Sequence, residues 1–392
     1  MTALHQIKNF GLKAIGTLGL SIMLAGCIET NTDSYGPKVD TNKLIVVGIM
    51  VPSGSSNVQT ELLADSLVNA ATLAMAEIDD VNIDLRLYPT GGDANQAASA
   101  AKRAANDGAK ILIGPLFAQA ANSAGAAVAG QNINVLSFSN NPDIAGGNIF
   151  ILGDTFNNTA NRVIGYATAQ GKRSVAALVR ADAAGTVAAS AVEAAAKNNG
   201  AAYVGVAKYE LTNESTVASV SATKSLIEQT GASALVMDAD AAGALPVFAQ
   251  LLPEAGISSA TTQFIGLARW DKTPERVRAS AGLQGALFAL NDTSATASFQ
   301  ERYLKAYGKN PHFLAGKAYD GMRAVITLLQ TGSRDALTRK ALTRSAGFNG
   351  ANGVFRFLEN GTNQRALAVA TFHDGQVVVV DPAPKNFSGA SF

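Results

Sequence analysis

Two Ser-x-x-Lys motifs are the residues of this 392-residue chain that could do covalent chemistry. Ser99–Lys102 and Ser221–Lys224 both fit the acylating motif of penicillin-binding enzymes, in which the serine is the nucleophile. Both lie on predicted helices of an alanine- and serine-rich chain, and the sequence has no Lys-Thr-Gly or Ser-Asp-Asn partner. It also lacks a Gly-x-Ser-x-Gly elbow and a P-loop. We therefore expect no enzymatic activity.

Metal, cofactor and nucleic-acid chemistry also lack a sequence signal. The three histidines, His5, His312 and His373, are far apart, and Cys27 is the only cysteine. One thiol and scattered imidazoles do not make a metal site. The formal net charge of +1 gives no electrostatic reason to expect nucleic-acid binding. We expect no cofactor, no metal and no nucleic-acid partner.

Polar side chains at the ends of predicted strands suggest non-covalent binding instead. The carboxyl ends of neighbouring parallel strands meet at one edge of a sheet, where open α/β sheets bind ligands. The cleft candidates are Ser137, Ser139, Asn140, Arg180, Asp182, Asp240 and Trp270. These residues also fit polar loops facing water, and Trp270 fits packing over a strand end as well as it fits a ligand anchor. Lys317 is expected to act as a cap or to bridge between the lobes rather than to bind a ligand.

The first 26 residues have the pattern of a secretory signal. Lys8 and Lys13 form a basic region, and the apolar run Ile15–Met23 is too short for a stable membrane span. The run ends in Leu-Ala-Gly-Cys, which resembles a bacterial lipobox and predicts lipidation of Cys27. Ile28, rather than Asp, follows the cysteine and favours the outer membrane. We expect a signal at residues 1–26 and a polar tether at residues 27–43.

The elements that must position the candidates alternate between strand and helix. Leu44–Val51 is a continuous apolar run, typical of a strand buried on both faces. The predicted helix Glu61–Asp79 follows it, and the order strand, helix, strand continues to about Gly153. Asp93 is expected to cap the helix Ala94–Asn106. This alternation predicts a parallel sheet.

A second series of the same kind follows, so we predict two α/β lobes with a central cleft. Lobe 1 is expected to comprise residues 44–154 and 292–365, and lobe 2 residues 155–291 and 366–386. Two helices, Ala295–Tyr307 and His312–Thr331, precede a β-rich tail. Asn360-Gly361 and Asp374-Gly375 mark its turns.

Several segments resemble, in order, the type I periplasmic binding proteins of the branched-chain amino-acid-binding kind. They are Gly48–Gly54, Leu73–Ile78, Gly91–Asp93, Asp107-Gly108, Ile113–Leu116, Val135–Ser137 and Tyr319–Gly321. The resemblance covers about Leu44–Pro382. It implies two Rossmann-like lobes and a small-solute site in the cleft of an ABC importer's receptor.

The tail resembles a narrower group, the bacterial penicillin-binding-protein activators. The residues concerned are Gly350–Arg356, Gln364–Ala368 and Phe372–Val377. That resemblance implies an outer-membrane lipoprotein that stimulates a bifunctional peptidoglycan synthase, a class A penicillin-binding protein. The enteric activators carry a further helical domain before this module, whereas here only the tether precedes Leu44.

The amino-acid pocket of the importer receptors is incomplete in this sequence. Leu116–Gln119 stands where those proteins usually have a pair of serines, and no tyrosine follows Asp182. For this reason the sequence favours a non-enzymatic regulator of peptidoglycan synthesis. The alternative is a substrate-binding lipoprotein of an ABC importer for an amino acid, an amide or a similar small solute.

Overall fold

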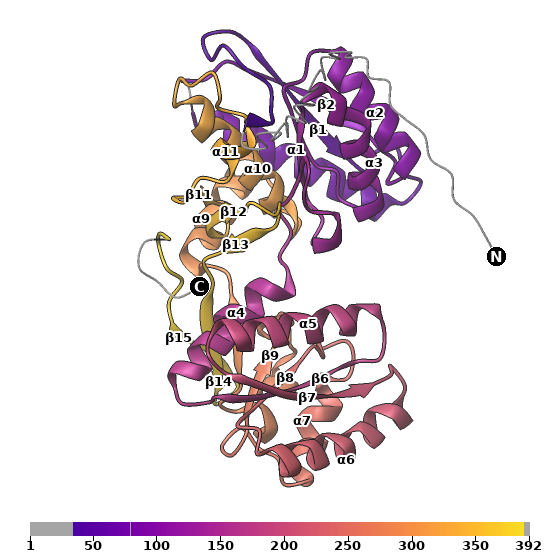
Figure 1. Cartoon of the computed structure of the whole chain (residues 1–392), viewed down its shortest axis with the longest axis vertical. Helices are drawn as coiled ribbons and strands as arrows, with labels where there is room; N and C mark the ends of the chain where they lie inside the picture. The colour runs from indigo at the N-terminus through magenta and orange to yellow at the C-terminus, as the bar shows by residue number, and fades with distance from the viewer. Residues whose placement is uncertain (1–33, 79, 388–392) are drawn as a thin grey trace, which may run out of the picture. The chain divides into compact units, whose positions relative to one another are not determined.

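The computed structural model describes residues 34–78 and 80–387. The predicted signal, the predicted lipidation site Cys27 and the first part of the tether lie outside this range. Within it, no helix combines the length and the apolarity that crossing a bilayer requires. The described chain forms two α/β lobes, as the sequence predicts, and a small third sheet (Figure 1).

Lobe 1 is built on a five-stranded, fully parallel sheet in the order β2-β1-β3-β4-β5. The strands are β1 (Ile45–Val51), β2 (Ile83–Pro89), β3 (Ile111–Ile113), β4 (Asn134–Ser137) and β5 (Ile149–Ile151). Every residue of β3, β4 and β5 is buried. This burial explains why these strands read as continuous apolar runs instead of alternating ones.

Helices cover both faces of this sheet. On one face Val47, Ile49 and Val51 share a core with α1 (Val58–Ala76) and α10 (Ala315–Leu329). On the other face Met50 and Leu112 share a core with α2 (Ala94–Asn106) and α3 (Ala118–Val128). Successive strand residues point to opposite faces, so β1 contributes to both cores. The helix α9 (Thr293–Tyr307) adds Phe299 and Tyr303 to the first core.

Lobe 2 has a seven-stranded sheet in the order β15-β14-β10-β9-β8-β6-β7. Its parallel strands are β6 (Ser174–Arg180), β7 (Ala202–Tyr209), β8 (Ala234–Met237), β9 (Gln263–Gly266) and β10 (Leu287–Leu290). The hairpin of β14 (Ala368–His373) and β15 (Gln376–Asp381) adds two antiparallel strands. Asp374 and Gly375 both have positive φ at its turn, as an Asp-Gly hairpin requires.

Two helices lie on each face of this sheet (Figure 1). The core under α4 (Phe156–Ala169) and α5 (Ala183–Asn198) is made mainly of alanine and β-branched residues. The core under α6 (Asn213–Thr230) and α7 (Leu245–Glu254) holds the aromatic residues Phe248, Phe264 and Trp270. Short elements complete the lobe, among them the 3-10 helix η4 (Trp270–Lys272) and α8 (Glu275–Arg278).

The tail also forms a small antiparallel sheet of β11 (Phe348–Gly350), β12 (Gly353–Phe357) and β13 (Asn363–Arg365). Phe348, Phe355 and Phe357 anchor this sheet in the core of lobe 1. The short helix α11 (Arg339–Leu342) precedes it. The chain leaves the small sheet at Arg365 and enters the sheet of lobe 2 at Ala368.

The chain runs between the two large sheets near residues 152–155, 291–292 and 366–367. The lobe boundaries expected from the sequence, at residues 154, 291 and 365, stay a prediction.

Side-chain capping sets several helix ends. Asp93 caps α2 as predicted, with its carboxylate accepting from the Gln96 amide at 2.8 Å. Asp182 caps helix α5, which begins at Ala183. The Asp240 carboxylate accepts from the amides of Ala242 and Gly243 and holds a turn there, so that α7 begins only at Leu245. Asx turns of this kind compete with helix for the same amides.

Candidate functional site

A hollow of about 320 Å³ lies at the carboxyl ends of strands from both lobes. We call it the strand-end hollow. Lobe 1 and its first connection to lobe 2 supply Asn140, Asn141, Pro142, Asp143 and Asp154, whereas lobe 2 supplies Phe156 and Asn157 from the start of α4 and Ala183, Ala184 and Val187 from α5. Open α/β sheets bind ligands at such an edge. The lining mixes three carboxamides and two carboxylates with small apolar groups, which suits a small polar solute.

On the lobe 1 side, the two predicted serines hold the strand-end loop together. The Ser137 hydroxyl donates to the Pro115 carbonyl at 2.8 Å and accepts from the Ser139 amide at 3.1 Å. The Ser139 hydroxyl accepts from the Asn141 amide at 3.1 Å. Both side chains are buried, whereas Asn140 is exposed and lines the hollow. Of these three candidates, only Asn140 presents its side chain to the hollow.

Phe117 lies in the segment where the resemblance to importer receptors implies a pair of serines. Its side chain is 47% exposed at the start of α3, and its ring edge lies over Gly92. A Cβ on Gly92 would come within 2.9 Å of that ring, so the close approach depends on glycine. The end of β3 therefore offers an aromatic surface in place of hydroxyl donors.

On the lobe 2 side, Arg180 links the ends of β6 and β8 by contacting a carboxylate that follows each strand. Its amide donates to Asp238 Oδ2 at 3.1 Å, and its guanidinium lies 3.4 Å from Asp182 Oδ2. The Tyr209 hydroxyl donates to Asp238 Oδ1 at 2.9 Å. Burial raises the pKa of Asp238, and burial together with that carboxylate raises the pKa of Tyr209. The predicted residues Arg180 and Asp182 are thus brought together around Asp238.

The two remaining candidates serve the fold. Asp240 caps the turn before α7, and its side chain is exposed. Trp270 is fully buried, and its indole N–H donates to the Ala239 carbonyl at 2.8 Å. Its ring packs directly on Gly266, where a Cβ would come within 2.4 Å. Of the two uses considered for Trp270, packing over a strand end is the one the structure shows.

A cluster of four ionised side chains borders the strand-end hollow. Lys317 Nζ donates to Asp154 Oδ1 at 2.6 Å, as expected of a bridging lysine. Arg365 lies 3.0 Å from the same oxygen through Nε, and its Nη1 donates to Asp320 Oδ2 at 2.8 Å. Lys317, Asp320 and Arg365 are buried, whereas the Asp154 side chain is 46% exposed. Asp154 is the member of the cluster that lines the hollow.

The cations of this cluster keep Asp154 ionised. Burial alone would raise its pKa, but the charges of Lys317 and Arg365 and the Lys317 hydrogen bond outweigh it and lower the pKa to about 2. The charge of Arg269 contributes in the same direction. For Lys317, burial and the neighbouring Arg365 charge lower the pKa. The cluster as a whole is electrically balanced, with two cations and two anions.

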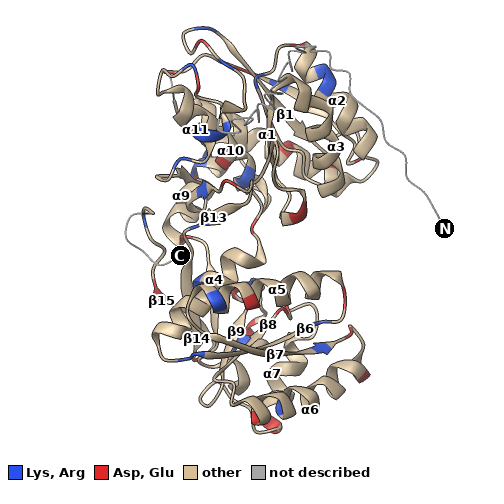
Figure 2. Ribbon diagram, viewed as in Figure 1, with Lys and Arg blue, Asp and Glu red and all other residues tan. Residues whose placement is uncertain are grey.

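A second hollow of about 430 Å³ lies between η4 and the start of α10. We call it the η4–α10 hollow. Its lining includes Arg269, Asp271 and Lys272 from η4, Asn291, Thr293, Thr296 and Gln300 around α9, His312, Phe313 and Gly316 around α10, and Asn352. Burial lowers the pKa of His312. The hydrogen bond to Asp271 raises the pKa of Arg269, and Asp154 adds to that effect. Figure 2 shows how the Lys, Arg, Asp and Glu residues are distributed over the ribbon.

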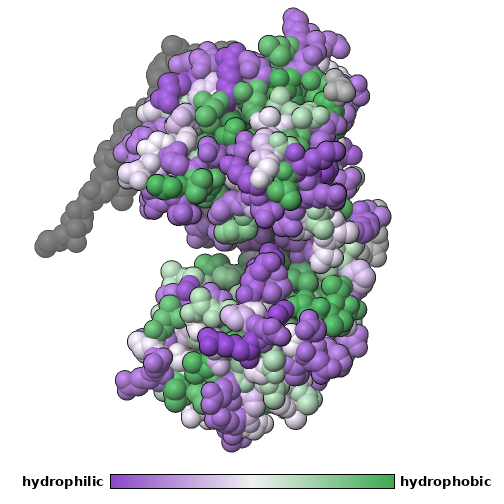
Figure 3. Space-filling model, turned by 180° about the vertical axis from the view of Figure 1, so that it is seen from behind, coloured by the Kyte–Doolittle hydropathy of each residue, from purple (hydrophilic) through white to green (hydrophobic). Residues whose placement is uncertain are grey.

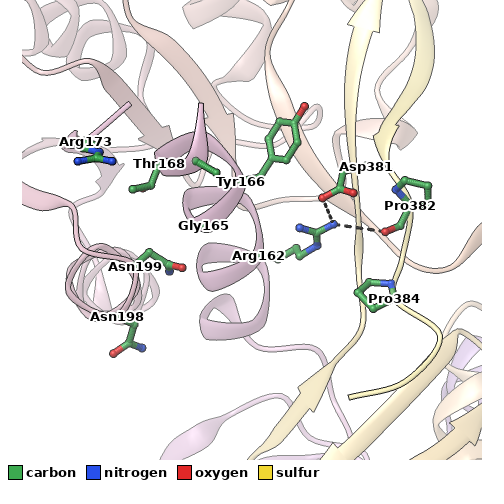
Figure 4. A pocket seen from close by; sticks show the side chains of 11 residues that line it. Arg162, Gly165, Tyr166, Thr168, Arg173, Asn198, Asn199, Asp381, Pro382 and Pro384 are labelled. Atoms are coloured by element: carbon green, nitrogen blue, oxygen red, sulfur yellow. Dashed lines mark hydrogen bonds and ion pairs between the residues drawn. The ribbon is translucent and has the colours of Figure 1, made fainter. Parts of the chain in front are cut away.

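A third hollow, of about 560 Å³, lies away from the strand ends, at the carboxyl-terminal ends of α4 and α5 (Figure 4). Arg162 in its wall donates to Asp381 at 2.7 Å and to the Leu367 carbonyl at 2.6 Å. Arg173 and Asn198 lie on the opposite side of the hollow. Because its buried cation is already paired, this hollow fits the attachment of β15 to α4 better than it fits a solute.

Comparison with known proteins decides the family. A sequence profile described as periplasmic binding protein matches residues 45–376, which is most of the chain. The chain belongs to the periplasmic binding protein family. No curated protein matches the sequence.

Solved structures agree on the fold. A protein of Rhodospirillum rubrum, provisionally described as a branched-chain amino acid ABC transporter, aligns with a TM-score of 0.70 at 19% identity, covering 86% of this chain and 100% of its own. An ABC transporter substrate-binding protein of Desulfitobacterium hafniense, solved with Leu, gives 0.59 at 18% identity, with 86% and 100% covered. A solute-binding protein of R. palustris, solved with benzoate, gives 0.55 at 14% identity, with 89% and 99% covered. At these identities the likeness shows the fold alone.

Sequence reasoning missed how the ionised cluster is assembled. Lys317 and Asp320 are three residues apart on a predicted helix, which places both side chains on one face. That spacing was a usable signal for a paired site. Asp154 and Arg365 come from connections between elements, and nothing in their local sequence indicates that they meet.

Proposed function

We propose that this protein is the solute-binding component of an importer and takes a small polar solute into the strand-end hollow. The observation that carries the proposal is the lining of that hollow, in which Asn140 of lobe 1, Asp154 of the connection and Ala183 of lobe 2 face one space. Membership of the periplasmic binding protein family supports it. The chain's place in the periplasm follows from the same family.

The way in which leucine-binding relatives recognise an amino acid does not transfer directly to this chain. Ser137 and Ser139 use their hydroxyls within their own loop, and Phe117 replaces another hydroxyl. Asn140, Asn141 and Asn157 offer donors and acceptors in the strand-end hollow. We infer that the solute is recognised mainly by carboxamides, so that amides and amino-acid derivatives come before simple amino acids as candidates.

Thermal unfolding with a panel of solutes tests this function. The panel should contain amino acids, their amides, aromatic acids such as benzoate, and muropeptides. A solute at 100 times its dissociation constant adds about 2.7 kcal/mol of stability by mass action. We expect at least one class to raise the melting temperature in a concentration-dependent way. If every solute leaves it unchanged at millimolar concentration, the proposal is wrong.

Activation of a class A penicillin-binding protein, which the sequence favoured, becomes the second candidate. Several solved structures that resemble this chain are described as ABC transporter proteins, and none of these is described as such an activator. One observation still favours a protein partner. The edge strand β15 exposes Val378, Val379 and Val380 by about 40% each. Exposed edge strands are templates for pairing with another chain.

The rest of the exposed surface offers a docking protein less continuous apolar area. Large exposed apolar residues such as Val58, Leu211 and Phe313 come from separate elements, and Figure 3 shows hydrophilic surface between the apolar patches on the face it displays. Pull-down of a class A penicillin-binding protein by wild type, and its loss with Val379→Lys, would support activation. The solute-binding proposal expects no pull-down by either protein.

We also propose that Cys27 is lipidated and that the protein is anchored, with the outer membrane favoured by Ile28. Cys27→Ser should release the protein from the membrane fraction into the soluble periplasm. Metabolic labelling with a palmitate analogue should mark wild type and not the variant. Equal labelling of both proteins would exclude this cysteine as the lipidation site.

A further inference from the structure

The described part of the predicted tether is packed on lobe 1. Val39 is 4% exposed and belongs to the core of that lobe. The Tyr35 carbonyl accepts from the Arg339 amide at 2.7 Å, and the Val39 amide donates to the Arg334 carbonyl at 3.0 Å. Residues 34–43 are therefore fixed against the segment that contains α11.

This contact lies at the edge of the lobe 1 sheet opposite to the strand-end hollow. The Tyr35 hydroxyl donates at 2.7 Å to the carbonyl of Ala129, which precedes β4. Asn134, the first residue of β4, donates through Nδ2 to the Leu337 carbonyl at 2.9 Å. The strand-end hollow is lined by Asn140, beyond the other end of the same strand. The tether thus reaches lobe 1 at the amino ends of its strands and leaves the carboxyl ends open.

The length of chain between Cys27 and Ser34 keeps this edge close to any lipid on the cysteine. Only residues 28–33 separate the two. An extended chain spans at most about 3.6 Å per residue, so the lipidated cysteine would lie no further than about 25 Å from Ser34. With Cys27 held in a bilayer, the amino edge of lobe 1 can reach the lipid headgroups.

The same edge carries an excess of positive charge. Its two segments, residues 34–43 and 331–345, are together called the tether-side patch. Their basic residues are Lys38, Lys43, Arg334, Arg339, Lys340 and Arg344, and their acidic residues are Asp40 and Asp335. Glu359, whose carbonyl accepts from Arg339, adds one acid at the border. Cations therefore outnumber anions two to one here, although the formal net charge of the whole sequence is only +1.

Two of these cations are available to an external anion. Arg334 and Lys340 are exposed, and neither forms an ion pair within the described residues. Lys38 is instead paired with Asp335, and Arg339 donates to backbone carbonyls. Figure 2 shows Lys and Arg residues at α11. Exposed cations without a local carboxylate suit a surface of phosphate groups.

We propose that the tether-side patch docks on the anionic phospholipid headgroups of the membrane that carries the anchor. The proposal goes beyond solute binding and takes its location from the lipidation of Cys27. Each Lys or Arg near an anionic leaflet strengthens binding, and a lipid chain and a basic patch reinforce each other. Docking through the amino edge of lobe 1 turns the strand-end hollow away from the bilayer and keeps it open to solutes.

Cosedimentation with vesicles tests the patch without its anchor. The probe is the chain from residue 27 onwards with Cys27→Ser, mixed with vesicles of phosphatidylglycerol or of phosphatidylcholine at low salt. We expect at least 10-fold stronger binding to phosphatidylglycerol and its loss in 0.5 M salt, because the patch acts through charge. Without acyl chains this binding is weak and reversible, so the same variant still leaves the membrane fraction in cells. Equal binding to both lipids, or none to either, would overturn the proposal.

Matched pairs of substitutions locate the effect. Arg334→Gln with Lys340→Gln should weaken binding to phosphatidylglycerol vesicles about 10-fold or more, since each cation contributes about fivefold. Lys197→Gln with Lys208→Gln removes two exposed cations of lobe 2 and should bind as the parent protein does. Equal weakening by both pairs would show that net charge acts and not the patch. Binding to isolated peptidoglycan in place of vesicles would also overturn the proposal.

The lipidated protein tests the orientation. Acylation occupies the sulfur of Cys27, the only cysteine, so an introduced thiol can be labelled alone. A fluorophore on Ser345→Cys, in the patch, should be quenched by a nitroxide-labelled lipid more than one on Lys208→Cys, in lobe 2. Equal quenching would contradict docking through lobe 1. Failure of lipidation would appear in metabolic labelling and failure of the patch in cosedimentation, so the two are distinguishable.

Discussion

At the residue scale, the ionised cluster shows how burial decides what a charge contributes. Arg365 and Asp320 are both buried, and neither has water to replace its partner. Asp154 faces a hollow and can be hydrated if Lys317 is lost. Removing one partner of a buried ion pair is costly because the other charge stays behind in a medium that solvates it poorly.

We therefore expect Arg365→Ala to destabilise the protein more than Lys317→Met does. The arginine variant leaves Asp320 buried and unpaired and should lose about 3–5 kcal/mol in the free energy of unfolding. The lysine variant leaves only Asp154, so its loss should be smaller. Urea unfolding followed by circular dichroism measures both, and Arg173→Ala is the surface control. Equal losses in the two variants would show that the exposure of Asp154 does not matter.

The pH dependence of Asp154 has a defined sign. Its pKa in the folded protein is about 2, below its ordinary value of 3.8. A carboxyl with a lowered pKa stabilises the fold fully above its unfolded value and loses that contribution as the pH falls towards the folded value. The stability difference between wild type and Asp154→Asn should therefore shrink between pH 4 and pH 2. A difference that grows over this range would contradict the assignment.

At the element scale, the strands and the alternating helices of both lobes could be read from the sequence. Continuous apolar runs such as Leu44–Val51 predict strands covered on both faces, and the structure confirms this burial for β1. Helix starts were harder, because the caps at Asp182 and Asp240 depend on local hydrogen bonds. The small sheet of β11, β12 and β13 was missed as a separate sheet, since strand patterns do not show which sheet a strand joins.

The turn after β3 allows a prediction at the element scale. Gly114 has a φ of 94°, and a Cβ there would come within 2.1 Å of the Met50 carbonyl oxygen. Gly114→Ala should cost about 1–2 kcal/mol for the backbone conformation and about as much again for the clash. Gly108→Ala is a matched control, because its φ is 90° and a Cβ there would meet nothing within 4 Å. Chemical denaturation should find the Gly114 variant less stable than the control, and equal stability would contradict the clash.

At the scale of the whole molecule, the sequence predicted the two-lobed fold and the region of the cleft, but its preferred function has not been supported. Asn140 lines the strand-end hollow and Arg180 meets Asp182, whereas Ser137, Ser139 and Trp270 are used by the fold. Hydroxyls and aromatic rings at strand ends have the same sequence pattern whether they face a ligand or the core. Only the three-dimensional contacts distinguish the two, which is why the roles of these side chains could not be predicted as the fold could.

Titration calorimetry with a blocked hollow tests solute binding most directly. The solute with the largest thermal shift should be titrated into wild type, into Ala183→Trp, which fills the strand-end hollow, and into Ala218→Trp on the exposed face of α6. We predict one site per chain in wild type and in the Ala218 variant, and affinity at least 10-fold weaker in the Ala183 variant. Undiminished binding by Ala183→Trp, or no binding by wild type, would contradict a solute site in this hollow.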